Sequence, residues 1–140
     1  MTLKKCSWDV TIEFGSFFSC PDAEVGRFVY IGAYSILGRV SIGDRVQIAS
    51  GVSIPSGRHQ HLMQQTGDRS LAAGLSHDAS FATVHIGHDT WIGERAVVMA
   101  DVGTGCVVGA GAVVCEPVPN GTLAVGVPAK SIRSLNMNKD

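Results

Sequence analysis

Two histidines stand where a regular sequence pattern breaks. The stretch Ser53-Ile54-Pro55-Ser56-Gly57-Arg58-His59-Gln60-His61 ends a series of six-residue repeats, and the pattern returns near Val84-His85-Ile86-Gly87. Imidazole has an unperturbed pKa of about 6.5, so it can take up and release a proton at neutral pH. His59 and His61 are therefore candidates for a general base. The alternative is that both are solvated loop residues without a chemical role.

The elements that must position these histidines are read from the repeat itself. An aliphatic residue recurs every six positions, a small or β-branched residue stands two positions before most of them, and Gly often follows. Side chains two apart on an extended segment point the same way, so each repeat predicts a short strand with two inward side chains. Gly in the turn is expected to tolerate backbone angles that a Cβ would oppose. The aliphatic positions are Val25, Ile31, Leu37, Ile42, Ile48, Ile54, Ile86, Ile92, Val98, Val102, Val108 and Val114.

Three such repeats make one triangular turn, and stacked turns bury a continuous aliphatic column. The sequence therefore predicts an all-β fold, a parallel β-helix in one domain of 140 residues. We expect residues 1-24 to cap one end, with Trp8, Phe14, Phe17 and Phe18 as the cover, and residues 117-140 to form the other cap and a tail. Residues 55-83 are an insertion, and loops longer than about 12–15 residues are usually functional or disordered.

Composition excludes several classes of function. A net charge of −1 argues against nucleic-acid and anionic-membrane partners, which need a basic face. The four cysteines lack C-x-x-C spacing and no signal peptide is apparent, so we expect reduced thiols and a cytoplasmic location. The weakly charged run 96–115 is interrupted by four glycines, and we expect no membrane span.

The period of six, the Trp91-Ile92-Gly93 motif and the closing Gly126-Val127-Pro128-Ala129-Lys130-Ser131-Ile132-Arg133 together resemble the hexapeptide-repeat acyltransferases. The resemblance runs from about Val25 to Arg133. It is strongest to the galactoside, maltose and xenobiotic O-acetyltransferases and to the small sugar acetyltransferases of polysaccharide biosynthesis. It implies a left-handed parallel β-helix, a homotrimer, and acetyl-CoA as acyl donor between neighbouring subunits, with no metal. The implied reaction transfers an acetyl group directly to a hydroxyl of a sugar or polysaccharide precursor.

The resemblance also assigns roles to residues near the insertion. In the similar enzymes the catalytic histidine lies where the loop leaves the coil, and here we favour His61 as the base, with His59 orienting it or contacting the acceptor. Arg58, His77 and Asp78 are the candidates for acceptor binding.

The implied donor site is carried by a second set of residues. Trp91 matches the tryptophan beside the substrate and pantetheine channel, and Glu94 follows that motif. Lys130 and Arg133 match basic residues near the coenzyme phosphates, where such groups pair with phosphate oxygens. The remaining donor-site candidates are Ala110, whose backbone would meet the coenzyme, and Cys115. The pair Cys115-Glu116 replaces a Thr-Lys pair common in sugar acetyltransferases, which implies the loss of one phosphate contact.

Three alternatives stay open at this point. The gamma-type carbonic anhydrases use the same fold with zinc held by histidines, two of them five apart; the fifth residue after His88 is Gly93, which departs from that spacing. A non-catalytic β-helix that serves in assembly would need neither His59 nor His61. An amine could also replace the hydroxyl acceptor.

Overall fold

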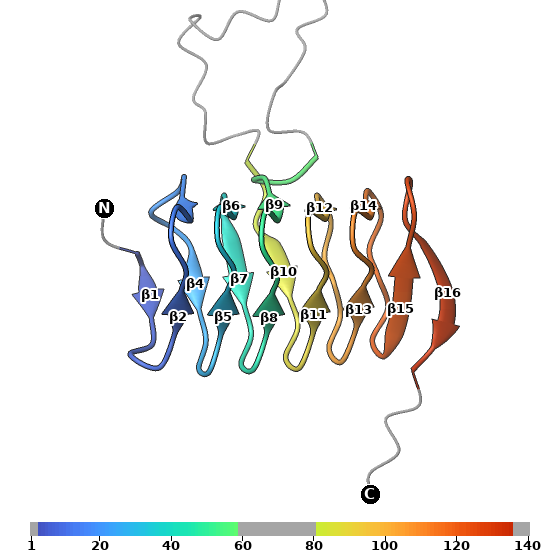
Figure 1. The fold of residues 1–140 in the computed structure, drawn as a ribbon, viewed down its shortest axis with the longest axis horizontal. Helices are drawn as coiled ribbons and strands as arrows, with labels where there is room; N and C mark the ends of the chain where they lie inside the picture. Colours follow the sequence, from blue (N-terminus) through green and yellow to red (C-terminus); the bar gives the residue numbers. More distant parts are fainter. Residues whose placement is uncertain (1–2, 59–80, 136–140) are drawn as a thin grey trace, which may run out of the picture.

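The computed structural model describes residues 3–58 and 81–135 of the chain. The chain winds as a left-handed parallel β-helix, as the resemblance implied, with short strands stacked along a single axis (Figure 1). The described ranges contain strands, turns and bends but no helix, and no helix in them could cross a membrane. The weakly charged run 96–115 forms strands and turns of this stack.

Three sheets form the sides of the prism. Sheet A has the order β1 (Lys5–Cys6), β4 (Glu24–Val25), β7 (Val40–Ile42) and β10 (Val84–Ile86), and bridges at Val102 and Val118 continue it. Sheet C has the order β3 (Phe17–Phe18), β6 (Ile36–Leu37), β9 (Ser53–Ile54), β12 (Val97–Val98) and β14 (Val113–Val114). Sheet B comprises β2 (Thr11–Ile12), β5 (Tyr30–Ile31), β8 (Gln47–Ile48), β11 (Trp91–Ile92), β13 (Val107–Val108), β15 (Thr122–Val125) and β16 (Lys130–Ser134).

The core occupies the inside of this prism and confirms the repeat. Each predicted aliphatic position is at most 4% exposed, from Ile31 at 0% to Ile42 at 4%. The small residues two positions earlier are also buried, apart from the half-buried Ala100. Equivalent residues are direct partners in neighbouring coils, as Ile31 and Ile48 are in sheet B. The period of six therefore sets both the burial and the register.

The expected reason for the repeated glycines was wrong. The glycines that follow the aliphatic residues do not have positive φ; they lie where the next coil comes close. A Cβ added at Gly32 would lie 2.6 Å from the backbone N of Ser50, and one at Gly93 would lie 2.5 Å from the N of Ala110. Contacts below 3.0 Å are essentially never seen for real Cβ atoms. The glycines thus permit the coil spacing.

The left-handed backbone angles occur two residues after these glycines, and several of the residues there are not glycine. Phe28, Tyr34, Arg45, Asp89 and Arg95 all have φ between 55° and 59°. Such residues cost of order 1 kcal/mol or more in strain, so the stacked coils must compensate for it.

The residues before Val25 form a further coil of the helix. Strands β1, β2 and β3 pair in register with β4, β5 and β6. Phe18 is buried in the core, but Trp8 is 89% exposed and Phe14 77% exposed in the single chain, and Phe17 is also exposed. In the single chain, Trp8, Phe14 and Phe17 therefore do not form the expected cover. At the other end, β16 turns back antiparallel to β15 and ends sheet B.

Candidate functional site

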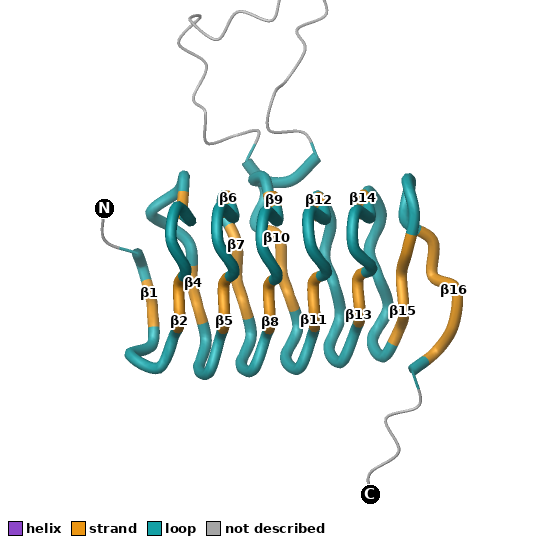
Figure 2. The backbone as a smooth tube through the Cα atoms, in the orientation of Figure 1, coloured by secondary structure: helices purple, strands orange, loops and turns teal. Residues whose placement is uncertain are grey.

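The two ends of the long insertion leave the helix together. They follow β9 and precede β10, at the corner between sheets C and A (Figure 2). The N–H of Ala82 donates to the carbonyl of Ser56 at 3.0 Å, and Ser56 Oγ accepts from the N–H of Arg39 at 2.9 Å. Gly57 has φ +81°, and a Cβ there would lie 2.9 Å from the Cβ of Ala82. We call residues 55–58 and 81–83 the stem; these contacts hold its two halves together.

Arg39 strengthens the stem from the neighbouring coil. Its guanidinium donates to the carbonyl of Phe81 at 3.4 Å and pairs with Asp22 at 3.1 Å. The same group lies 5.9 Å from the centroid of the Phe81 ring. Nothing in the repeat marks either contact: Phe81 follows Arg39 by 42 positions, and Asp22 precedes it by 17.

Arg58, the last described residue before the candidate bases, reaches along the corner. Its Nη1 donates to the carbonyl of Cys115 at 3.1 Å and to Glu116 Oε1 at 2.5 Å. Cys115 and Glu116 directly follow β14, whereas Arg58 belongs to the coil of β9, and β12 lies between these two strands in sheet C. Arg58 therefore crosses one whole coil. Its predicted contact with an acceptor remains a prediction.

The candidate bases His61 and His59, and the acceptor candidates His77 and Asp78, lie outside the described residues. Their predicted roles stay predictions. The structure describes the stem as far as Arg58, which directly precedes His59 in the sequence.

Most of the predicted donor-site residues gather on sheet B and its corner with sheet C. Trp91, half-exposed at 51%, projects from β11 between Gln47 and Val107 of the adjacent strands. The N–H of Gly111 donates to the carbonyl of Glu94 at 2.7 Å, which stacks Ala110 one coil beyond Glu94. Both of these residues are exposed.

Lys130 and Arg133 extend the same side of the prism. Both lie on β16 and are exposed, and Arg133 pairs with Leu123 of β15 in the row that continues from Trp91 and Val107. Cys115 lies apart from this group, because it follows β14 at the other edge of sheet C, on the side of the stem. The structure thus brings five of the six predicted donor-site residues to one side and Cys115 to another.

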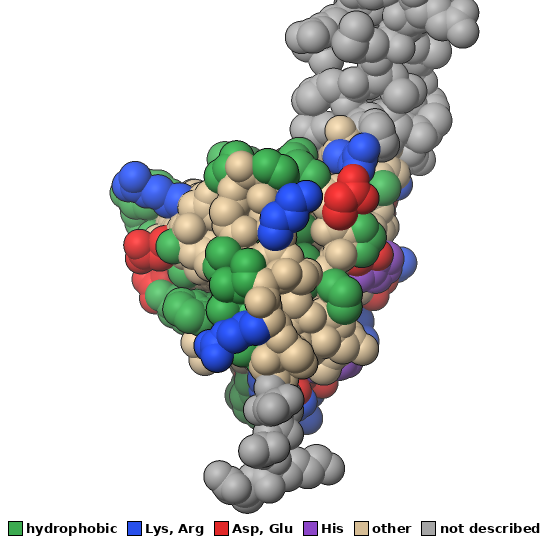
Figure 3. Space-filling model, turned by 90° about the vertical axis from the view of Figure 1, so that its right-hand side faces the viewer, with side chains coloured by type: hydrophobic (Ala, Val, Ile, Leu, Met, Phe, Trp, Pro, Cys, Tyr) green, Lys and Arg blue, Asp and Glu red, His purple; other side chains and the backbone are tan. Residues whose placement is uncertain are grey.

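Sheet A presents a different, polar surface. Its outward residues in successive strands are Lys5, Glu24, Ser41 and His85, and a groove of 510 Å³ runs along it. Viewed down the axis, the visible histidines lie on one side of the triangular outline (Figure 3). The groove lies away from Trp91 and the basic residues of β16, which do not line it.

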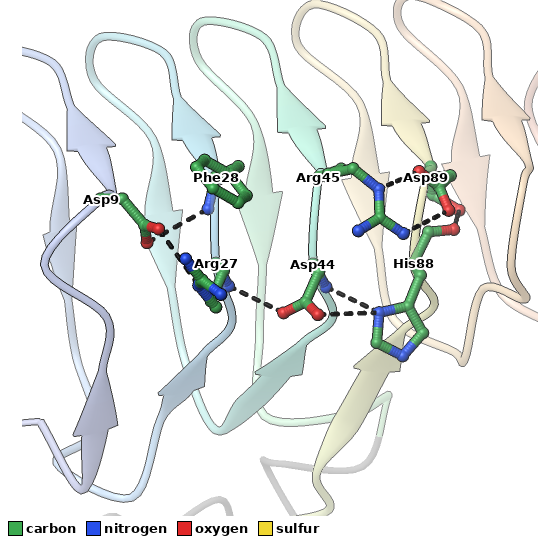
Figure 4. A network of polar contacts seen from close by, with 8 residues as sticks. Asp9, Arg27, Phe28, Asp44, Arg45, His88 and Asp89 are labelled. Atoms are coloured by element: carbon green, nitrogen blue, oxygen red, sulfur yellow. Dashed lines mark hydrogen bonds and ion pairs between the residues drawn. The ribbon is translucent and has the colours of Figure 1, made fainter.

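A ladder of polar contacts links the coils at the corner between sheets A and B (Figure 4). The N–H of Arg27 donates to Asp44 at 2.8 Å, and the N–H of Asp44 donates in turn to His88 Nδ1 at 2.8 Å. Arg45 forms a two-pronged pair with Asp89 at 2.6 and 3.0 Å, and this hydrogen bonding lowers the pKa of Asp89 below its usual range. His88 is thus an acceptor in a structural ladder.

The contacts of His85 and His88 are relevant to the alternative of a zinc enzyme. The Nδ1 of His88 accepts a backbone N–H, and the Nδ1 of His85 lies 3.4 Å from Asp101. Within residues 3–58 and 81–135, no group of three or more His, Cys, Asp or Glu side chains is placed to hold a metal ion.

Comparison with known proteins agrees with the fold and the repeat. The family described as the hexapeptide repeat of succinyl-transferase matches residues 24–55 and 83–116, which flank the insertion on both sides. The chain therefore carries hexapeptide repeats of the kind that this family describes. Among its relatives is a 2,3,4,5-tetrahydropyridine-2,6-dicarboxylate N-acetyltransferase from Staphylococcus aureus (strain bovine RF122 / ET3-1). That protein is 36% identical over 87 residues, which make up 61% of this chain and 35% of the relative.

Two solved structures share the fold over almost the whole chain. A galactoside acetyltransferase in complex with coenzyme A has a TM-score of 0.74 and 26% identity, covering 96% of this chain and 65% of that one. A maltose O-acetyltransferase from Clostridium difficile 630 has a TM-score of 0.76 and 23% identity, covering 92% and 68%. The curated relatives are much longer than their match to this chain, which spans between 19% and 35% of their length.

Proposed function

We propose that this hexapeptide-repeat protein transfers an acetyl group from acetyl-CoA to a hydroxyl of a sugar or polysaccharide precursor. The observation that carries the proposal is the placement of Trp91, Glu94, Ala110, Lys130 and Arg133 on one side of the prism, between the coil of β11 and β16. The likeness to a galactoside acetyltransferase that holds coenzyme A supports the same assignment.

The donor would lie along this side. The ammonium of Lys130 and the guanidinium of Arg133 are exposed cations on one short strand, suited to the phosphates of the coenzyme. Ala110 and Gly111 leave space for the pantetheine arm, because a Cβ at Gly111 would meet nothing within 4 Å. Trp91 offers an exposed ring beside that path. Cys115, at the stem, would approach only the reactive end of the donor.

The reaction needs a base and no covalent enzyme intermediate. A sugar hydroxyl is a weak nucleophile at neutral pH, whereas the thioester is already activated. His61 would take the hydroxyl proton while the oxygen attacks the thioester carbonyl carbon. The tetrahedral oxyanion then collapses, the carbon–sulfur bond breaks, and the same imidazole returns the proton to the departing thiolate. Backbone N–H groups would stabilise the oxyanion, and His59 would orient His61 or contact the acceptor.

The stem is what would deliver this base. His61 follows Arg58 by three residues, and three residues of chain span at most about 11 Å. Arg58 is held against Cys115 and Glu116, so a base at position 61 would be within reach of this corner. Arg58, His77 and Asp78 complete the proposed acceptor contacts.

The distribution of polar and apolar residues over the outer faces of the three sheets supports a homotrimer. Sheet A presents charged and polar residues outward, whereas sheet B presents Tyr30 and Trp91 and sheet C presents Phe17 and Ile36, all at least 40% exposed. Exposed apolar surface of this kind marks interaction sites. A prism that buries two sides against two neighbours can close a ring of three. Light scattering should then give three times the 14.7 kDa mass of one chain.

An amine acceptor is the second candidate. The Staphylococcus aureus relative, 36% identical, is named as an N-acetyltransferase. The donor side and the base would serve both acceptors, since each loses a proton on attack. The acceptor would be distinguished by the residues around the stem.

The test is thiol release from acetyl-CoA across a panel of sugars and amino sugars. We expect turnover with a hydroxyl acceptor, a large loss in His61→Ala, and a smaller one in His59→Ala. Full turnover in His61→Ala would remove His61 as the base, and turnover only with amino sugars would favour the second candidate. Stoichiometric zinc in the purified protein would overturn the proposal in favour of the zinc enzyme. A protein that neither binds coenzyme A nor turns over would favour an assembly module.

A further inference from the structure

The stem carries an ion pair between Arg58 and Glu116 that the stacking of the coils does not by itself explain. Arg58 donates both to the carbonyl of Cys115 and to the carboxylate of Glu116, at 3.1 and 2.5 Å. The two partners are 57 and 58 positions later in the sequence. Adjacent strands of a sheet are about 4.8 Å apart, so this contact spans roughly two such spacings along the corner.

Stability alone does not account for it. The side chains of Arg58 and Glu116 are 46% and 73% exposed, and exposed ion pairs contribute little to folding. The coils beneath are already joined by sheet C and by a fully buried core. What the pair does constrain is the direction of the chain at residue 58, because Arg58 is the last residue before His59.

The ion pair also changes how the glutamate at position 116 is interpreted. Read alone, a glutamate where similar enzymes carry lysine removes a cation from this place. In the structure the guanidinium of Arg58 comes from two coils away to the same place, so a cation is still present beside residue 116. Relative to the similar enzymes, the cation beside residue 116 now comes from Arg58. The ion pair between Arg58 and Glu116 therefore connects the coil of residue 116 to the stem.

We propose that Arg58 and Glu116 form a clasp that positions the catalytic histidine, with Glu116 acting through Arg58 as a positioning residue. This inference rests on the proposed acetyltransferase function. Small displacements of a catalytic group reduce the rate strongly while leaving substrate binding intact. The clasp should therefore act on kcat and leave the KM for acetyl-CoA almost unchanged.

The first experiment is steady-state kinetics on the full chain. We expect Glu116→Gln to lower kcat about tenfold to a hundredfold, with the KM for acetyl-CoA within about twofold of wild type. Wild-type kcat in Glu116→Gln would overturn the clasp.

The chain supplies a matched control. Arg45 and Asp89 form an equally short exposed pair between two coils, but at the corner between sheets A and B. Asp89→Asn removes an ion pair of the same type, and we expect its kcat to equal that of wild type. A loss of kcat there comparable to that in Glu116→Gln would mean that any bond between coils matters, which contradicts a specific role for the stem.

A second readout does not depend on activity. Trypsin must take the Arg58 guanidinium into its own pocket to cleave between Arg58 and His59, and the clasp competes for that group. Glu116→Gln should speed this cleavage about two- to fivefold, the range of one exposed ion pair, with cleavage after Arg69 as the reference in the same sample. Unchanged cleavage refutes the clasp. A wild-type protein without any acetyl transfer would instead refute the proposed function, and the proteolysis would still decide on the clasp.

Discussion

Adding one methyl group at Gly32 should force two coils apart. Gly32 has no positive φ, so alanine suits its backbone, but the new Cβ would lie 2.6 Å from both the C of Ala49 and the N of Ser50. Ordinary van der Waals contact begins at 3.4 Å, so these atoms must move by 0.8 Å, the difference between the two values. They are backbone atoms of the next coil and cannot rotate away as a flexible side chain can.

The cost has two contributions. The N–H of Gly32 donates to the carbonyl of Ile48 at 2.7 Å, and this bond joins the same two coils at the same point. Losing much of it costs about 0.5–1.5 kcal/mol, and overpacking adds about 1–3 kcal/mol. We expect Gly32→Ala to lower the free energy of unfolding by about 2–4 kcal/mol, which for this size corresponds to a fall in Tm of roughly 6–20 °C.

Thermal unfolding followed by circular dichroism measures this at one fixed protein concentration, because oligomers unfold in a concentration-dependent way. The control is Gly111→Ala, since Gly111 has φ +68° and open space around it. That variant has only backbone strain of about 1 kcal/mol. If Gly32→Ala were no less stable than Gly111→Ala, close approach of the coils would not be the reason for the glycines.

Three further outcomes are expected. Ile48→Ala, at a position with no exposed surface, should cost about 2–5 kcal/mol in denaturant unfolding, and a smaller loss would mean that the coils collapse onto the cavity. The pKa of Asp89 is lowered by hydrogen bonding to Arg45; the stability that this gives is present above the unfolded pKa of about 4 and is lost as pH falls through the lower folded value. Asp89→Asn should remove that part of the acid dependence, and an unchanged acid unfolding curve would refute it. Lys130→Ala with Arg133→Ala should raise the KM for acetyl-CoA about tenfold or more, whereas a change in kcat alone would place the phosphates elsewhere.

The core could be predicted from the sequence because its cause is local. Side chains alternate along each short strand, so the inward positions repeat with the strand and need no knowledge of the neighbours. The glycines were located correctly but explained wrongly, because their reason is the approach of a backbone from the next coil rather than their own backbone angles. Non-glycine residues such as Tyr34 and Arg95 occupy the left-handed positions, and no feature of their type signals this.

Short motifs mark Trp91 and the basic residues of β16 in the sequence, and their roles in donor binding stay predictions. The contacts of Arg39 and Arg58 could not be predicted, because each joins residues 42 or more positions apart across the insertion. Such contacts arise from how the coils stack on either side of the insertion. The length of the intervening sequence does not limit them.

Surface charge in this fold is arranged along columns of coils, and residue 116 is an example. In a stacked helix the neighbours of a surface residue are those above and below it along the axis, and each comes from a different part of the sequence. A substitution at one level can be matched by a residue one or two levels away, as Arg58 matches Glu116 here. Because Arg58 directly precedes the candidate bases in the sequence, its pairing with Glu116 would, under the proposed function, couple the charge at residue 116 to the position of the base. A lysine at 116 would repel Arg58 and break that coupling.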